Sequence, residues 1–142
     1  MNKINLVIAV LLLFAASCKK ETIETAPIEY APLEVVESLS EAKSLAEQEK
    51  KSIFVFVSAK WCSSCVTFKE NVWSDAAVRA KVRERYIILL SDHDEAEGEK
   101  FRKDYNLNGR PSFLVIQSDM TEVAKRLGSI DKTAFINWIE SL

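Results

Sequence analysis

Two cysteines separated by two residues, Cys62 and Cys65, are the side chains of this sequence best suited to chemistry. The same spacing occurs in zinc sites, in haem attachment sites and in dithiols that exchange disulfides, so the surrounding residues must distinguish them. The apolar run at residues 53–57 is typical of a buried strand. Residues 62–73 contain no glycine or proline and place Cys65 and Phe68 on one helical face. The pair therefore lies where a strand ends and a helix begins.

The start of a helix is a suitable place for a reactive thiolate. Its unpaired backbone N–H groups and the helix dipole stabilise negative charge, which favours the ionised form of Cys62. Cys65 lies about one turn further along the chain and can reach the same sulfur. We therefore interpret the pair as a redox-active dithiol, in which Cys62 is the attacking nucleophile and Cys65 is the resolving thiol.

Residues 1–17 have the pattern of an export signal, with a positive charge at Lys3, an apolar stretch and small residues before Cys18. The apolar stretch is shorter than the roughly 20 residues that a membrane span needs. Small residues directly before a cysteine resemble the lipobox of bacterial lipoproteins. This resemblance implies that Cys18 becomes the lipid-anchored N-terminus of an exported protein of the periplasm or cell envelope. The alternative is an ordinary signal peptide that leaves Cys18 as an unpaired thiol.

A metal site is the main alternative for the cysteine pair. A structural zinc ion needs four ligands and a catalytic one at least three. With Cys18 set aside for the lipid, the chain offers two cysteines and one histidine, His93. His93 lies in the acidic loop at residues 91–95, and we interpret it as a solvated residue with no role in the site. No metal site is predicted, although a copper(I) carrier with two thiolate ligands remains an alternative.

Length and composition are consistent with one domain. The chain has 142 residues, of which 48% are hydrophobic, and this is enough for a single core. Residues 18–37 include Pro27 and Pro32 and are predicted to form a flexible linker, so the domain is expected at residues 38–142. The net charge is −2 and the two signs are interspersed, so nothing indicates nucleic-acid binding.

Within the expected domain, helix and strand patterns alternate. Ser38 and Glu41 form a capping box before a helix that runs to about residue 50. Ser74 is expected to cap a later helix. The other predicted elements are a strand at 86–90, a helix at 95–105 weakened by Gly98, a hairpin of 113–116 with 122–127, and a final helix at 131–142.

These motifs resemble the thioredoxin superfamily over residues 38–142. The Trp-Cys-x-x-Cys sequence at 61–65 and the Ser-Asp-x-x-Val sequence at 74–78 look most like the C-terminal periplasmic domain of DsbD-type thiol–disulfide interchange proteins. The resemblance implies an α/β thioredoxin fold, a single domain with a central mixed β-sheet flanked by helices. It also implies a thiol–disulfide oxidoreductase without a cofactor. Its partners would be protein thiol or disulfide substrates and a dithiol electron donor, and a redox-inactive adaptor that binds peptides is the alternative.

The resemblance also implies a docking surface beside the cysteines. In the family a tryptophan flanks the site, and this position is Trp61. A proline in a cis peptide bond faces the cysteine pair, and Pro111 after Arg110 occupies that place. The backbone of Arg110 is then expected to pair with an extended substrate segment, a mode of binding that does not demand a particular sequence.

The sequence departs from the family at two positions near the sulfurs. Phe56 stands where many relatives have a buried carboxylate, and Lys69 stands where DsbD-type domains have an acid. Together with Lys60 and Arg110, Lys69 is expected to lower the pKa of Cys62 and to make the disulfide more oxidising. The alternative is that the lysines extend into water and contribute little.

Overall fold

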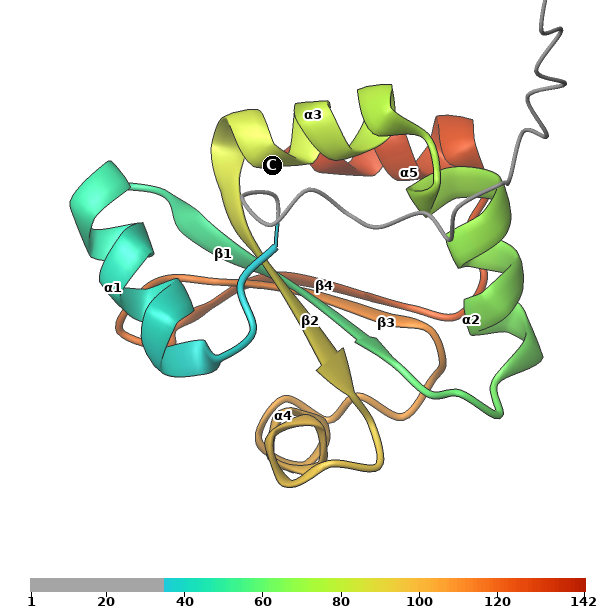
Figure 1. Ribbon diagram of the computed structural model, residues 1–142, viewed down its shortest axis with the longest axis horizontal. Coiled ribbons are helices and arrows are strands. Elements are labelled where there is room, and N and C mark those ends of the chain that lie inside the picture. The colour runs from blue at the N-terminus through green and yellow to red at the C-terminus, as the bar shows by residue number, and fades with distance from the viewer. Residues whose placement is uncertain (1–34) are drawn as a thin grey trace, which may run out of the picture.

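The computed structural model describes residues 35–142 (Figure 1). The predicted export signal, the predicted lipid attachment at Cys18 and most of the predicted linker lie outside these residues. Among residues 35–142, no helix has both the length and the apolar character needed to cross a bilayer.

A four-stranded mixed sheet forms the centre of the domain. Its strands are β1 (Ser52–Ser58), β2 (Tyr86–Asp92), β3 (Ser112–Ile116) and β4 (Glu122–Leu127), and their order in the sheet is β2-β1-β3-β4. β1 runs parallel to β2, and β3 is antiparallel to both β1 and β4. The central mixed sheet predicted from the sequence is therefore confirmed.

Helices cover both faces of this sheet (Figure 1). α2 (Ser63–Phe68), a π-helical turn η1 (Lys69–Trp73), α3 (Ala76–Arg85) and α5 (Lys132–Glu140) share one hydrophobic cluster with the sheet, and α1 (Leu39–Glu49) and α4 (Ala96–Asp104) share the other. Half of the buried residues of the first cluster are aromatic, and we call it the aromatic cluster. The buried residues of the second, the aliphatic cluster, are aliphatic except for Phe101.

β1 supplies side chains to both clusters. Phe54 and Phe56 point into the aromatic cluster, whereas Ile53, Val55 and Val57 point into the aliphatic one. The alternation follows from the two-residue period of a strand. Because both faces of β1 are covered, its sequence is continuously apolar rather than alternating. The strand that leads to the cysteine pair is thus fixed on both sides.

The helix that carries the cysteines, α2 continued by η1, leads into α3 differently from what we expected. We call α2 and η1 together the redox helix. We expected Ser74 to cap the following helix, but the cap of α3 is Asp75, whose Oδ1 accepts the N–H of Ala77 at 2.9 Å. The N–H of Ser74 instead reaches back five residues to the carbonyl of Lys69 at 2.8 Å, which closes the π-helical turn. This wider turn allows the adjacent residues Val72 and Trp73 both to be buried, and that burial is the physical reason for the difference.

The chain is capped and tied to the sheet where α1 begins. The Ser38 Oγ accepts the N–H of Glu41 at 3.3 Å, so the predicted cap of α1 is present. Val36, which falls in the last part of the predicted linker, already donates its N–H to the carbonyl of Ile88 at 2.9 Å and forms a bridge with Leu89. The chain therefore contacts the outer edge of β2 before α1 begins.

Gly98 in α4 has a packing reason that the sequence did not reveal. The helix passes so close to the end of β2 that a Cβ at this position would collide with the carbonyl of Asp92. What we predicted as a weak point in the helix is thus the residue that permits this close approach.

Candidate active site

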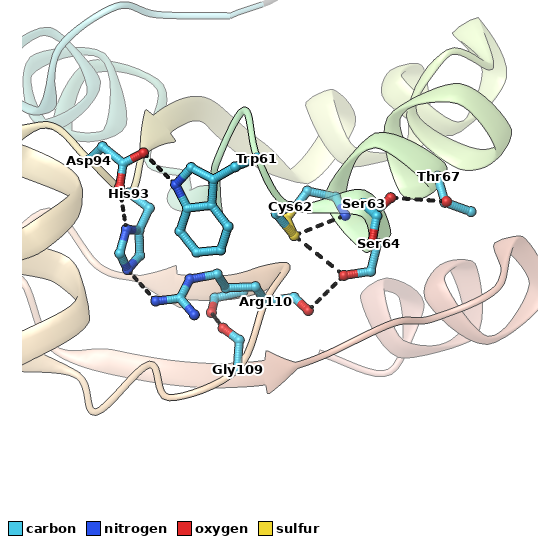
Figure 2. The surroundings of a disulfide bond; sticks show 11 residues. Trp61, Cys62, Ser63, Ser64, Thr67, His93, Asp94, Gly109 and Arg110 are labelled. Atoms are coloured by element: carbon cyan, nitrogen blue, oxygen red, sulfur yellow. Dashed lines mark hydrogen bonds and ion pairs between the residues drawn. A yellow bond between two sulfur atoms is a disulfide. The ribbon is translucent and has the colours of Figure 1, made fainter.

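Cys62 and Cys65 lie at the junction of β1 and α2, as the sequence predicts. Cys62 is the N-cap residue of α2, and its Sγ accepts the N–H of Cys65 at 3.2 Å. The two residues form a disulfide with their Cα atoms 5.2 Å apart (Figure 2). Cys65 is fully buried, and Cys62 keeps 6% of its surface exposed. Cys62 is therefore the sulfur that is more open to attack, and a backbone donor already points at it.

Ser64 connects the cysteine pair to the loop before β3. Its Oγ lies 3.3 Å from the Cys62 Sγ and 3.2 Å from the carbonyl oxygen of Arg110. A sulfur in a disulfide carries no proton, so the Ser64 hydroxyl is the donor in both contacts and its single proton is shared between two acceptors. A Cys62 thiolate, once formed, is the stronger of the two acceptors.

The structure brings Trp61, Arg110 and Pro111 to the side of the disulfide. The peptide bond between Arg110 and Pro111 is cis, as the sequence resemblance implied. The guanidinium carbon of Arg110 lies over the Trp61 ring, 4.8 Å from its centroid. Trp61 is 60% exposed whereas Pro111 is buried, so the indole is the side chain of this group that faces solvent.

The three residues expected to tune the sulfurs take different positions. Phe56 is fully buried in β1 and packs its ring edge against Phe68. The Nζ of Lys69 lies 5.7 Å from the centre of the Phe56 ring, while Lys60 is exposed in the turn before Trp61. An apolar ring thus occupies the position where the family resemblance implied a carboxylate. The effect of these residues on the pKa of Cys62 stays a prediction.

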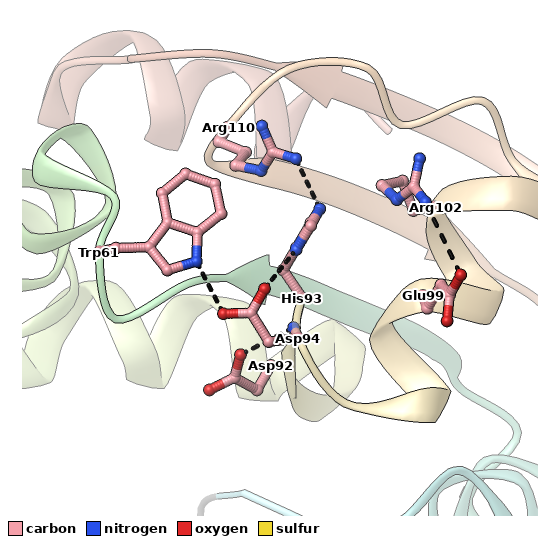
Figure 3. Close-up of polar contacts among 7 residues, drawn as sticks. All are labelled: Trp61, Asp92, His93, Asp94, Glu99, Arg102 and Arg110. Atoms are coloured by element: carbon pink, nitrogen blue, oxygen red, sulfur yellow. Dashed lines mark hydrogen bonds and ion pairs between the residues drawn. The ribbon is translucent and has the colours of Figure 1, made fainter.

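His93 corrects an expectation from the sequence. We expected a solvated loop residue outside the site, but its side chain is only 16% exposed. Its Nε2 lies 2.6 Å from Nη2 of Arg110, its Nδ1 lies 3.0 Å from Oδ1 of Asp94, and its ring meets Trp61 edge-on (Figure 3). The reason is topological, because β1 and β2 are parallel neighbours and the loops that follow them meet at the same end of the sheet.

Asp94 completes this group of side chains and was also missed. Its Oδ2 accepts the indole N–H of Trp61 at 2.7 Å (Figure 3). The hydrogen bond with His93, and then the one from Trp61, lower the pKa of the Asp94 carboxyl. The signal that could have found both residues is their place directly after a buried strand that is parallel to the strand before the cysteines.

A groove of about 520 Å³ lies beside the disulfide. Ser64, Phe68 and Val72 line it from the redox helix, and Ile130 lines it from the loop before α5. In residues 35–142, no group of three or more histidine, cysteine or acidic side chains is arranged to hold a metal ion. Ser64, which lines the groove and contacts the Cys62 sulfur, is the residue that links the groove to the disulfide.

Comparisons with known proteins agree with this geometry. Residues 34–118 match a protein-family model described as Thioredoxin-like. The chain is similar to the thiol:disulfide interchange protein DsbD of Actinobacillus pleuropneumoniae, with 26% identity over 113 residues, and to DsbD of Haemophilus influenzae, with 24% identity over 127 residues. These alignments cover 77% and 87% of this chain but only 19% and 22% of the relatives, so the chain spans about a fifth of their length.

Solved structures show the same architecture. The oxidised C-terminal domain of DsbD from Neisseria meningitidis superposes with a TM-score of 0.60 at 24% identity, covering 72% of this chain and 90% of that domain. A thioredoxin from Thermus thermophilus superposes with a TM-score of 0.67 at 22% identity, covering 75% and 84% of the two chains. The predicted thioredoxin fold is confirmed.

Proposed function

The chain belongs to the thioredoxin-like family, and from that premise we propose that it is a thiol–disulfide oxidoreductase acting on protein disulfides. The observation that carries the proposal is the Cys62–Cys65 disulfide at the start of α2, with the more exposed sulfur next to the cis Arg110–Pro111 bond. The similarity to DsbD, a thiol:disulfide interchange protein, supports the same reaction.

The reaction proceeds by two exchanges. The Cys62 thiolate attacks one sulfur of a substrate disulfide, which forms a mixed disulfide and releases the other substrate sulfur as a thiolate. Cys65 then loses its proton and attacks the Cys62 sulfur, so that the Cys62–Cys65 disulfide forms and the second substrate thiolate leaves. Two electrons pass to the substrate. A dithiol electron donor must reduce the Cys62–Cys65 disulfide before the next cycle, and no cofactor takes part.

Burial supports Cys62 as the attacking nucleophile and Cys65 as the resolving thiol. The 6% exposure of Cys62 gives an incoming sulfur access, whereas Cys65 is covered completely and is reached only through Cys62. The N–H of Cys65, which already points at the Cys62 sulfur, stabilises that sulfur when it is a thiolate. The surface formed by Trp61, Arg110 and Pro111 then receives the substrate backbone next to the reacting sulfur.

Insulin reduction with a small thiol as electron source tests the proposal. The wild-type protein is expected to accelerate precipitation of the insulin chains, and Cys62→Ser is expected not to. A Cys18→Ala variant serves as the control, because the proposed lipid site takes no part in the exchange. Stoichiometric copper(I) binding without insulin reduction would instead establish the copper carrier, and neither activity would leave a peptide-binding adaptor.

The direction of the reaction depends on the redox equilibrium of the disulfide. We propose that Phe56, together with the positive charges of Lys60, Lys69 and Arg110, makes the disulfide more oxidising than in relatives with a buried carboxylate. Equilibration with reduced and oxidised glutathione measures this directly. A strongly reducing equilibrium would show that these residues do not set the potential.

We also propose that the protein is exported and held at a membrane by a lipid on Cys18. The pattern of residues 1–17 supports this location, as does the C-terminal DsbD domain that the chain resembles. Growth of the native host with labelled fatty acid tests it. The wild type should carry the label and Cys18→Ala should not, and label that persists in the variant would reject the anchor.

A further inference from the structure

The side chains of Trp61, Asp94, His93 and Arg110 form a closed ring of contacts beside the disulfide (Figure 3). The Trp61 N–H donates to Asp94, Asp94 contacts His93, His93 contacts Arg110, and the Arg110 guanidinium lies over the Trp61 ring. The two members expected to face the substrate are Trp61 and Arg110. The two behind them, His93 and Asp94, are therefore placed to hold them in position.

The contacts of His93 with Arg110 and Asp94 determine which of its nitrogens carries a proton. A guanidinium only donates hydrogen bonds, so Nε2 of His93 must accept from Arg110 at 2.6 Å. The remaining ring nitrogen, Nδ1, must then carry the proton and donate it to the Asp94 carboxylate at 3.0 Å. Both contacts are satisfied only when His93 is neutral and protonated on Nδ1. A second proton would place an N–H of His93 directly against an N–H of Arg110.

The backbone of His93 is fixed independently of its ring. Its N–H donates to the carbonyl of Ser58, the last residue of β1, at 2.7 Å. The ring therefore cannot move away from Arg110 by displacement of its loop without breaking this bond to the strand that leads to Cys62. A change in the charge of the ring is transmitted to Arg110 rather than absorbed by the loop.

We propose that His93 is a positioning residue that holds Arg110 against Trp61 for docking of protein substrates, and that it does so only in its neutral form. This inference rests on the proposed function and deepens it. When His93 takes up a proton, Arg110 loses its acceptor and the docking surface opens, while the cysteine pair itself is unchanged. Acid slows exchange with every disulfide by protonating the Cys62 thiolate, and exchange with docked proteins is expected to fall further than exchange with small disulfides.

The charged groups that face His93 come from three segments. Asp94 adjoins it in the loop, Arg110 approaches from the segment before β3, and Glu99 in α4 acts on it at longer range. Lys103 lies 2.6 Å from Glu99 and Arg102 lies 4.0 Å from it, and both offset part of that charge. Histidine is the side chain whose ordinary titration falls between about pH 5 and 8, which is the range the experiment must cover.

The test compares a protein substrate with a small one. For the wild type and His93→Ala, we measure kcat/KM for insulin and the rate of exchange with oxidised glutathione, which needs no docking surface. His93→Ala is expected to lose about tenfold in kcat/KM for insulin, mainly through a higher KM. Its exchange with glutathione is expected to change less than twofold. An equal loss in both reactions, or in neither, would overturn the proposal.

A conservative variant of His93 distinguishes the loss of its hydrogen bond with Arg110 from a general change in structure. In His93→Gln the side-chain oxygen can accept from Arg110 but cannot titrate. As the pH is lowered over the range in which both proteins stay folded, the ratio of insulin to glutathione rates should fall in the wild type and change less than twofold in His93→Gln. Taking this ratio removes the pH dependence of the thiolate itself. A ratio that falls equally in both proteins would overturn the proposal.

The imidazole resonances of the wild type provide a check that is independent of activity. Nitrogen chemical shifts at neutral pH should show the proton of His93 on Nδ1, and a proton on Nε2 would overturn the proposal even if insulin were not a substrate. Failure of the proposed function has a different outcome, since the wild type itself would not reduce insulin.

Discussion

On one side of the disulfide, Cys62, Ser64 and Cys65 belong to a single helix start, and their contacts span three residues of sequence. On the other side, the contacts of Trp61 with Asp94 and of His93 with Arg110 span 33 and 17 residues. We call the first set the helix-start half of the site and the second set, Trp61, His93, Asp94 and Arg110, the assembled half. The bond-forming atoms lie in the helix-start half, and the expected recognition surface is the assembled half.

Burial separates the two halves as well. The two cysteines are almost completely covered, whereas Trp61 is 60% exposed and Asp94 is also exposed. A reacting sulfur benefits from a fixed, dry environment, while a docking surface must meet its partner in water. Because different contacts build the two halves, we expect that exchange chemistry and substrate recognition can be altered separately in this protein.

Removal of either cysteine should abolish turnover and also distinguish their roles. Cys65→Ser is expected to accumulate covalent adducts with substrate proteins, because the mixed disulfide on Cys62 can no longer be resolved. Cys62→Ser is expected to form none. Non-reducing gels of both variants, with the double variant as control, measure this. Adducts that occur only in Cys62→Ser would reverse the roles that burial supports.

A charge behind the helix-start half should mainly affect stability. Phe56→Asp removes a fully buried ring from β1 and is expected to lower the free energy of unfolding by at least about 3 kcal/mol. Where folded protein remains, the new carboxylate should raise the pKa of Cys62. Phe56→Leu, expected to cost about 1 kcal/mol, is the matched control. Denaturant unfolding and thiolate absorbance are the measurements, and an unchanged pKa in folded Phe56→Asp would contradict tuning from this position.

Ser64 is the residue through which the two halves touch, and its removal should have a moderate effect. In the reduced protein its hydroxyl is expected to donate to the Cys62 thiolate, a contact worth about 1 kcal/mol. Ser64→Ala should therefore raise the pKa of Cys62 by about 0.7 units and make the disulfide less oxidising by about 20 mV. Ser63→Ala, at an exposed neighbouring position, is the control. If the Cys62 thiol had the same pKa in both variants and in the wild type, Ser64 would not stabilise the thiolate.

Replacement of Asp94 should have the smallest effect, a change in stability that is seen only at acidic pH. Its pKa is lowered in the folded protein by the bonds with His93 and Trp61. The stability that it contributes is therefore fully present above its unfolded pKa of about 3.9 and is lost as the pH falls through the lower folded value. Asp94→Asn does not titrate, so its stability should decline less steeply than that of the wild type below about pH 4. Parallel acid-unfolding curves would show that the assembled half does not hold this carboxylate.

The sequence predicted the helix-start half because its determinants are local. The spacing of Cys62 and Cys65, the apolar run before them and the absence of glycine or proline after them lie within one short segment. Strands β1, β2 and β3 were likewise evident from their apolar runs, whereas β4 was inferred from the turn residues between it and β3. The cis bond before Pro111 was anticipated through family resemblance rather than through any local propensity.

The assembled half could not be predicted in the same way. From sequence alone, the acidic loop at residues 91–95 is expected to be exposed to solvent. Only the parallel pairing of β1 with β2 shows that this loop lies next to the cysteine pair. The cap of α3 illustrates the same point at short range. Ser74 and Asp75 are both good caps, and the burial of Val72 and Trp73 in the π-helical turn decides between them.

The close approach of α4 to the end of β2 at Gly98 limits how this protein can be stabilised by mutation. Replacement of a helix glycine by alanine is a common route to a more stable protein, since alanine is the better helix former by about 1 kcal/mol. Here the added methyl group must push α4 away from the carbonyl of Asp92, or push the end of β2 away from α4. His93 follows Asp92 directly, so the second movement would carry it away from Arg110. Gly98→Ala is therefore expected to weaken the contact of His93 with Arg110 without making the protein more stable.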